Sequence, residues 1–288
     1  MRTRAVSLLL PIVLLAACAD RPTGPGDDPA IPHATGPTDL LVRVEVGGGL
    51  VPIEWNLRNL PSFSLFGDGT LITPGAQIEI YPSPALPAIS RRAVDEEGVQ
   101  AILREALGAT RDLPDGLDDP GVVAIADAPT TTITIRADGI ERRIEIYALA
   151  ELTERPQGMP EDVYRARNRL AGLVTKLTGL DGWVPDGALG PEGSFTGDAA
   201  LVFVGRYRPV EDLAQEEIAW PIGDSLAALG GDDAIGYRCG TVVGEDWRAV
   251  LDAARRANEL TPWTDGGHRF SVLFRPLLPD ESGCAGEE

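Results

Sequence analysis

The chain has 288 residues, of which 43% are apolar, and its 44 acidic against 25 basic residues give a formal charge of −19. This charge excludes nucleic acid and anionic lipid headgroups as partners of the folded part, because proteins bind both through Lys and Arg side chains. The apolar fraction is that of a globular protein, and the length allows one large domain or two small ones.

The first 17 residues have the three-part layout of a secretory signal peptide. Arg2 and Arg4 make a positive start, residues 5–15 form an apolar run, and two alanines follow. The run is shorter than the roughly 20 apolar residues that a membrane-spanning helix needs. We therefore expect residues 1–17 to direct export and not to remain as a membrane span.

The segment Leu15-Ala16-Ala17-Cys18 resembles the lipobox of bacterial lipoproteins. The resemblance implies that Cys18 carries a fatty acyl chain such as palmitate and that the signal peptide is cut just before it. Two or three acyl chains would anchor the protein stably at the extracytoplasmic face of the cell envelope, because each buried methylene contributes ~0.8 kcal/mol. The alternative is an ordinary secretory signal cut nearby, in which Cys18 has no role.

Residues 18–39 have the composition of a tether. Between residues 20 and 38 there are five prolines, three glycines and almost no apolar side chains. Such a segment cannot bury enough surface to fold. We expect the folded body to begin at residue 40 and to stand off the membrane, with His33 lying in the tether.

The body opens with strand patterns. Residues 40–46 are rich in valine and leucine and end at three glycines, which indicates a strand. Asp68-Gly69 interrupts the apolar segment 63–72, which predicts a hairpin with a type I′ turn, because both central residues of that turn have positive φ. A further strand is expected at 78–81, before three closely spaced prolines forbid regular pairing.

Two helices and a second hairpin follow. Asp95 is a favourable N-cap for a helix over 96–107, in which apolar residues recur at helical spacing. Residues 131–147 alternate with period two around an Asp-Gly pair, which predicts a hairpin. Pro160 suits the start of a helix over 161–177 with one apolar face.

Glycine and proline cluster at 179–197, which we interpret as a connector. The body is therefore divided into 40–180 and 181–288, as two domains or subdomains. The second part has strand patterns at 200–207, 218–222, 237–243 and 268–274 and a helix pattern from Asp246. Together these elements predict an α+β fold of antiparallel hairpins with interspersed amphipathic helices, in a strand–strand–helix order that can repeat.

Three stretches resemble a family of secreted bacterial lipoproteins to which no activity is assigned. They are residues 127–139, the Phe-Gly-Asp-Gly hairpin, and the closing segment 275–279 with Cys284. The resemblance covers most of the mature chain. It implies the location and the fold, and it carries over no catalytic residue.

The cysteines indicate a disulfide. With lipid on Cys18, Cys239 and Cys284 remain as a pair in an oxidising compartment. The alternatives are a free thiol or a metal site, but two cysteines without nearby histidine cannot fill a tetrahedral zinc shell. We expect a bond between Cys239 and Cys284, and neither a metal nor a cofactor.

The residue inventory disfavours the familiar catalytic devices. His268 is the one histidine left for the body, no Gly-x-Ser-x-Gly motif accompanies it, and we expect it on the surface. The glycines at 47–49 and 67–69 are expected in turns, because no Lys-Ser or Lys-Thr follows them. One acidic loop departs from the EF-hand pattern, so calcium is not expected there. Its carboxylates are Asp112, Asp115, Asp118 and Asp119.

Tryptophan is the most promising ligand contact. Trp247 lies on the inward face of its helix and is assigned to the core, whereas Trp183 and Trp263, beside Pro, Gly or Asp, are expected to be exposed and able to stack on a sugar or peptide. The sequence thus favours a non-enzymatic envelope module that binds a protein, peptide or cell-wall ligand. The alternative is an anchored hydrolase using paired carboxylates.

Overall fold

The computed structural model describes residues 29–118, 121–123, 125–229 and 236–284. Residues Ile31–Glu288 cluster into one compact unit. The expected signal peptide and the lipidation residue Cys18 lie outside the described residues. Among the helices that are described, none has the length and apolarity required to cross a membrane.

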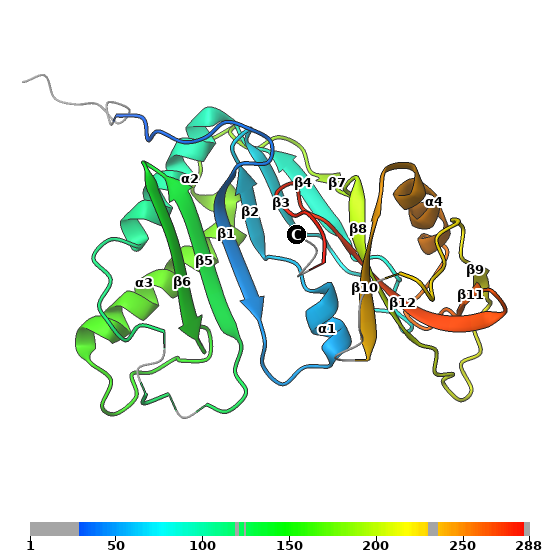
Figure 1. Cartoon of the computed structure of the whole chain (residues 1–288). Helices are drawn as coiled ribbons and strands as arrows, with labels where there is room; N and C mark the ends of the chain where they lie inside the picture. The colour runs from blue at the N-terminus through cyan, green and yellow to red at the C-terminus, as the bar shows by residue number, and fades with distance from the viewer. Residues whose placement is uncertain (1–28, 119–120, 124, 230–235, 285–288) are drawn as a thin grey trace, which may run out of the picture. The chain divides into compact units, whose positions relative to one another are not determined.

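The larger sheet consists of six strands from residues 40–147 and the short strand β7 from the connector region (Figure 1). Its order is β6-β5-β1-β2-β3-β4-β7, and all neighbouring strands are antiparallel. The strands are β1 Leu40–Gly47, β2 Phe63–Phe66, β3 Thr70–Pro74, β4 Ile89–Ala93, β5 Thr130–Ala137, β6 Ile140–Tyr147 and β7 Gly193–Ser194.

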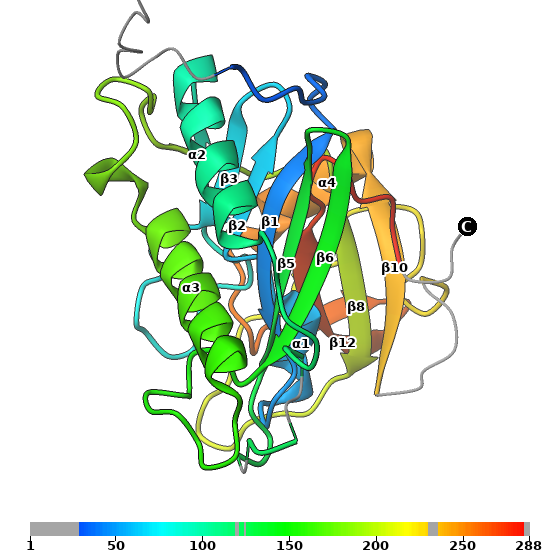
Figure 2. The ribbon, with the colours of Figure 1, turned by 90° about the vertical axis from the view of Figure 1, so that its left-hand side faces the viewer.

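Two helices cover one face of this sheet, as Figure 2 shows from the side. They are α2, Glu96–Ala109, and α3, Glu161–Thr178. Asp95 caps α2 as expected, because its side chain accepts a hydrogen bond from the N–H of Gly98. The apolar stripes of both helices pack with the inner residues of β1, β5 and β6 into one core, as helical periodicity predicts.

The smaller sheet comes from the second half and has the order β10-β8-β12-β11-β9. Its core contains Trp247 from helix α4 together with Trp220, Trp263 and Phe274. The elements are β8 Ala199–Arg206, β9 Ile218–Ala219, β10 Tyr237–Val243, α4 Gly244–Ala254, β11 Trp263–Asp265 and β12 His268–Pro276. Segregated antiparallel hairpins and helices confirm the expected α+β class.

The β2–β3 hairpin forms where it was predicted, but with a different turn. Gly69 donates its N–H to Phe66 O, so Gly67 and Asp68 are the central residues, and of these three only Gly69 has a positive φ, of 78°. This is a three-residue loop that ends in a left-handed residue, and the expected type I′ turn was wrong. A Cβ on Gly69 would lie 2.1 Å from Val94 O, so only glycine fits there.

The β5–β6 hairpin confirms its prediction in detail. Asp138 and Gly139 have φ of 55° and 67°, as a type I′ turn requires. Strand β6 forms an outer edge of the larger sheet, since its described partner is β5 alone. Three charged side chains, Glu141, Arg143 and Glu145, point outward along it.

The expected strand at 78–81 is wrong. Residues 75–80 have no regular structure, and Ile78, Ile80 and Tyr81 are exposed. The reason is that β3 ends at Pro74 and the chain returns to the sheet only at Ile89, with Pro82, Pro84 and Pro87 between. Short elements without a long pattern were missed, namely α1 Ile53–Arg58, β4, β7, β11 and the single turn Leu180–Gly182.

The N-terminal segment of the body begins before residue 40. Gln100 of α2 accepts from the N–H of Ile31 at 2.7 Å and donates to its carbonyl at 2.9 Å, and Pro32 O accepts from Asp138 N at 2.7 Å. His33 has a side chain only 5% exposed, because it lies between Ala34 O and the carboxylate of Glu96. Residues 31–39 therefore belong to the body, although their composition is that of a tether.

Candidate functional site

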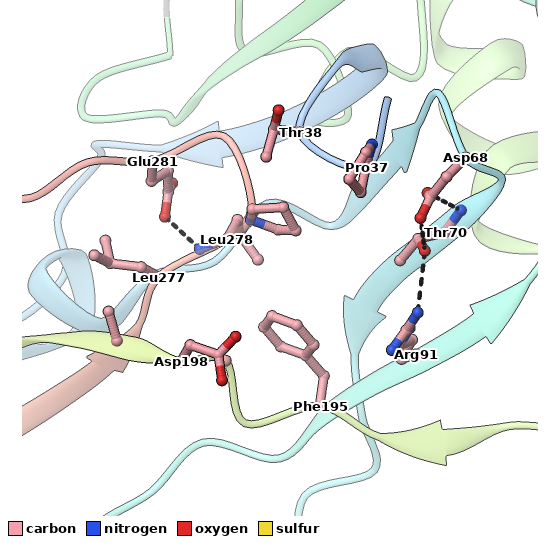
Figure 3. Close-up of a pocket in the computed structure, with 13 residues that line it drawn as sticks. Pro37, Thr38, Asp68, Thr70, Arg91, Phe195, Asp198, Leu277, Leu278 and Glu281 are labelled. Carbon is pink, nitrogen blue, oxygen red and sulfur yellow. Dashed lines mark hydrogen bonds between the residues drawn. The ribbon is translucent and has the colours of Figure 1, made fainter. Parts of the chain in front are cut away.

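A cleft of about 410 Å³ opens between the larger sheet, the start of β8 and the segment after β12 (Figure 3). Its size is that of a pocket for a small molecule or short peptide. Five stretches of the chain, far apart in sequence, provide its walls. The lining residues are Pro37, Thr38, Asp68, Thr70, Arg91, Phe195, Gly197, Asp198, Ala199, Leu277, Leu278, Pro279 and Glu281.

One wall comes from the β2–β3 turn and β4. The carboxylate of Asp68 accepts from the N–H of Thr70 at 2.9 Å and from its hydroxyl at 3.1 Å. Arg91 lies opposite Ile72 in the β3–β4 ladder, and its Nη2 donates to Thr70 Oγ1 at 3.3 Å. Asp68 is thus occupied by local bonds, while the exposed guanidinium of Arg91 keeps donors for a ligand.

The second wall comes from the chain between β7 and β8. Phe195 is held by its N–H, which donates to Ile89 O at 2.9 Å, and its ring forms part of the floor. Gly197 turns the chain with a φ of 64°. The exposed carboxylate of Asp198 points into the cleft from this wall, while its carbonyl accepts from Gly244 N.

The third wall is the C-terminal tail, which we define as residues 277–284. Leu277 donates its N–H to Ala199 O at 2.9 Å, so the tail starts against β8. Arg43 of β1, whose side chain is largely buried, pairs with Asp280 at 2.6 Å. Arg275 binds both carboxylate oxygens of Glu281 at 2.8 and 2.7 Å. The tail is therefore fastened by charged bonds as well as by apolar packing.

The disulfide between Cys239 and Cys284 closes the end of the tail and confirms the prediction from cysteine number. It joins β10, the strand before α4, to the chain beyond the last strand, with a Cα–Cα distance of 6.0 Å. Cys284 is buried. The wall of the cleft thus lies between two fixed points, β12 on one side and the disulfide on the other.

Glu281 is held in its charged form. Burial by itself would raise the pKa of this carboxyl, but the hydrogen bonds and charge of Arg275, the N–H of Leu278 and the charge of Arg43 outweigh burial, so the pKa lies below its ordinary value of 4.5. A carboxyl with a lowered pKa is a poor general acid. Its role in the cleft wall is structural.

Replacing Glu281 by glutamine should lower the free energy of unfolding by about 1.5–3 kcal/mol near neutral pH, the range for hydrogen bonds to charged groups. A lowered pKa contributes stability only while the carboxyl is ionised, so the cost should be full above pH 4.5 and shrink as the pH falls below it. Urea unfolding over a pH series measures this. Glu141→Gln, at an exposed ion pair, is the control. A cost that persists unchanged in acid would contradict the assignment.

The two tryptophans proposed as ligand contacts do not line this cleft. Trp263 was expected to be exposed, and that was wrong: it is fully buried, edge-on to Trp220 and Phe274 at 5.7 and 5.4 Å between centroids. Trp183 is half-buried against the larger core, donates to Lys176 O at 2.8 Å and has Lys176 Nζ 5.8 Å from its ring. Trp247 is fully buried, as expected.

The structure brings no catalytic set together in its described part. His268 is exposed beside the β11–β12 turn, as expected. No Asp or Glu is fully buried in the described ranges, and the largely buried Glu281 is held in its charged form. Within the same ranges, no cluster of three or more His, Cys, Asp or Glu could hold a metal ion.

The cleft residues Arg91, Phe195 and Asp198 were not singled out from the sequence, and Asp68 was read only as a turn residue. Each lies in a stretch without a motif, and the sheet topology alone brings them together. No family model, curated protein or solved structure matches the chain.

Proposed function

We propose that the chain is a lipid-anchored, extracytoplasmic binding protein and that the cleft is its ligand site. The signal-like residues 1–17 and the lipobox-like segment ending at Cys18 support the location. The pKa of the cleft carboxyl Glu281 lies below its ordinary value, so Glu281 is a poor general acid, which favours binding over hydrolysis. The resemblance of three stretches of the chain to secreted lipoproteins supports the same location.

One observation carries the ligand class. The cleft has a cation, Arg91, on one wall and a carboxylate, Asp198, on another, with the apolar side chains of Phe195 on the floor and Leu278 on the third wall (Figure 3). Guanidinium binds a carboxylate through parallel hydrogen bonds, and a carboxylate binds an ammonium group. The ligand is therefore a short zwitterion with small apolar side chains, such as a peptide or the peptide part of a wall fragment.

Calorimetry of the full chain with trialanine tests the ligand class. We expect binding, at least about tenfold weaker for Arg91→Met and for Asp198→Asn, since each removes one charged hydrogen-bond partner of about 1.5–3 kcal/mol. N-acetyl trialanine lacks the ammonium group and should lose the contribution of Asp198. Trialanine amide lacks the carboxylate and should lose the contribution of Arg91. Arg136→Met, at an exposed ion pair on β5, is the matched control. Equal affinity in the cleft variants and the control would remove the cleft as the site.

The anchor has its own test. Cys18→Ala should move the protein from the detergent phase to the aqueous phase in a phase-partition experiment, because the acyl chains supply the membrane affinity. Mass spectrometry of the unmodified protein should show the acyl groups on Cys18. A Cys18→Ala protein that stays in the detergent phase would mean that the lipobox was misread.

A further inference from the structure

Most of the large exposed apolar side chains come from two segments of the chain, which meet at a hollow distinct from the cleft. Seven of the nine large apolar residues that are exposed in the described ranges come from two segments, the chain around α1 and the loop after β3. We call them the apolar surface. Its members are Leu50, Val51, Ile53, Trp55, Ile78, Ile80 and Tyr81.

The surface encloses a groove. Between α1 and the loop after β3 lies a hollow of about 380 Å³, to which Trp55 and Ile78 contribute from the two sides. Leu60, Pro74, Pro84 and Leu86 form much of the rest. The surface therefore offers both projecting apolar side chains and a recess, as protein-binding surfaces do.

Folding does not account for these residues. Helix α1 buries none of its six residues and has no side-chain cap, and Leu50 and Ile78 are 84% and 65% exposed. Polar side chains at the most exposed positions, Leu50 and Ile78, would cost the fold little, because most of their surface faces solvent. Large exposed apolar patches of this kind mark interaction sites.

Both segments that carry the surface are hydrogen-bonded to the rest of the body at one end. Asn59, at the end of α1, donates to Val46 O at 2.6 Å, and its carbonyl accepts from Arg275 of β12 at 2.9 Å. Glu259 accepts from Ser83 N at 2.8 Å and donates its own N–H to Ser83 O at 2.9 Å. These bonds hold the ends of both segments in place, which lowers the ordering entropy that binding costs.

The charges around the surface are negative. Glu79, between Ile78 and Ile80, is exposed, and so is Asp127, whose carbonyl accepts from Leu50 N at 3.1 Å. Neither carboxylate has an ion pair in the described ranges, whereas Arg58 in the groove lies 3.8 Å from Glu259. The whole chain carries −19. An occupant with positive charge is therefore favoured.

The position of the surface separates it from the N-terminal attachment. Ile31 and Pro32 bind at the end of the sheet where β1 begins, beside the β5–β6 turn. The apolar surface follows the other end of β1, next to α1 in Figure 1, roughly 25 Å further along the strand at ~3.3 Å per residue. The surface lies at the opposite end of β1 from the side to which the N-terminal chain is joined.

We propose that the apolar surface docks a cationic amphipathic peptide segment, with leucine-like side chains in the groove and Lys or Arg facing Glu79 and Asp127. A second copy of the chain would bring like charges together, which is unfavourable. A bilayer would have to accommodate the carboxylate of Glu79 between two inserted isoleucines. This site is distinct from the cleft, and the proposal does not depend on the cleft's ligand.

The test uses the full chain and a labelled peptide of leucine and lysine with leucine at helical spacing. Fluorescence anisotropy of the peptide is measured in buffer for the unlipidated chain. The lipidated chain is placed in phosphatidylcholine vesicles, and the signal of the peptide with empty vesicles is subtracted. We expect saturable binding that weakens with salt and falls at least about tenfold in Trp55→Ser and in Ile78→Ser, as for central interface residues. Glu79→Gln should reduce the salt dependence.

The control is Val243→Ser, since Val243 is 60% exposed but lies on β10. Binding unaffected by Trp55→Ser and Ile78→Ser, or equal binding of a matched leucine and glutamate peptide, would overturn the proposal. Dimers that dissociate in these variants would assign the surface to a second copy instead. Quenching of Trp55 by brominated phosphatidylcholine, judged against Trp55→Phe, would assign it to the bilayer. Both outcomes contradict a peptide occupant.

Discussion

Replacing Trp247 by alanine is expected to lower the free energy of unfolding by about 3–5 kcal/mol, the range for large aromatic side chains in a core. Trp247 is fully buried among the residues of the smaller core, 6.3 Å between ring centroids from Phe274. Its Nε1 also donates to Thr196 O at 3.1 Å, next to Phe195 of the cleft. The substitution therefore leaves a cavity and an unpaired carbonyl beside the cleft wall.

Urea unfolding followed by circular dichroism measures this change. Trp55→Ala is the matched control, because Trp55 is 46% exposed and its removal should cost less than about 1 kcal/mol. If both substitutions cost the same, the packing of α4 on the smaller sheet would need revision. Trialanine affinity should also fall in Trp247→Ala, because Thr196 adjoins the cleft wall.

Removing the disulfide, by Cys239→Ser with Cys284→Ser, should destabilise the protein by about 4 kcal/mol in the chain-entropy model. The two cysteines are 45 residues apart, and a crosslink over a loop of this length restricts the unfolded chain strongly. Part of the loss should be local. The C-terminal tail would keep Arg43–Asp280 and Arg275–Glu281 but lose its last fixed point.

Two measurements separate the global from the local effect. Thermal unfolding gives the stability, and hydrogen exchange of the tail amides gives the local opening free energy. Reduction of the unmodified protein should reproduce both changes, whereas the double variant should be insensitive to reductant. Two thiols that alkylate in the native protein before reduction would contradict the bond.

Elements with a long repeating pattern were predictable from the sequence. The helix that begins after Asp95 has two independent signals, a capping residue and apolar side chains at helical spacing. The hairpin at Asp138 and Gly139 also has two, its turn residues and the alternation of its strands. The disulfide followed from counting cysteines. The helix and the hairpin depend on residues close together in the sequence, and the disulfide on cysteine number, so each could be predicted from the sequence alone.

Short elements failed because tertiary contacts create them. Strand β11 has only three residues and forms because β12 pairs with it on one side and β9 on the other. In the sequence, Trp263 stands beside a proline and near two glycines, which is typical of a loop residue. The same holds for His33, because distant residues, Gln100 and Asp138, bind the chain just before it and Glu96 contacts its ring. Composition cannot reveal partners that lie so far along the chain.

The cleft is the extreme case of this limit. Arg91 and Asp198 are separated by more than a hundred residues and are ordinary surface charges in sequence. They line the same cleft because β7 pairs with β4, through two residue pairs that no sequence pattern predicts. Buried Arg43 is similar, since its partner Asp280 is supplied by the far end of the chain.

The outer edge at β6 has a consequence for crowding. An unpaired strand edge is a template on which another chain can add a strand, and high surface density makes such encounters frequent. Along this edge the outward side chains alternate in sign, Glu141, Arg143 and Glu145, and Arg143 and Glu145 are also paired with each other at 2.8 Å. An approaching strand would have to strip water from these charges. These charges therefore oppose edge-to-edge pairing of two molecules through β6.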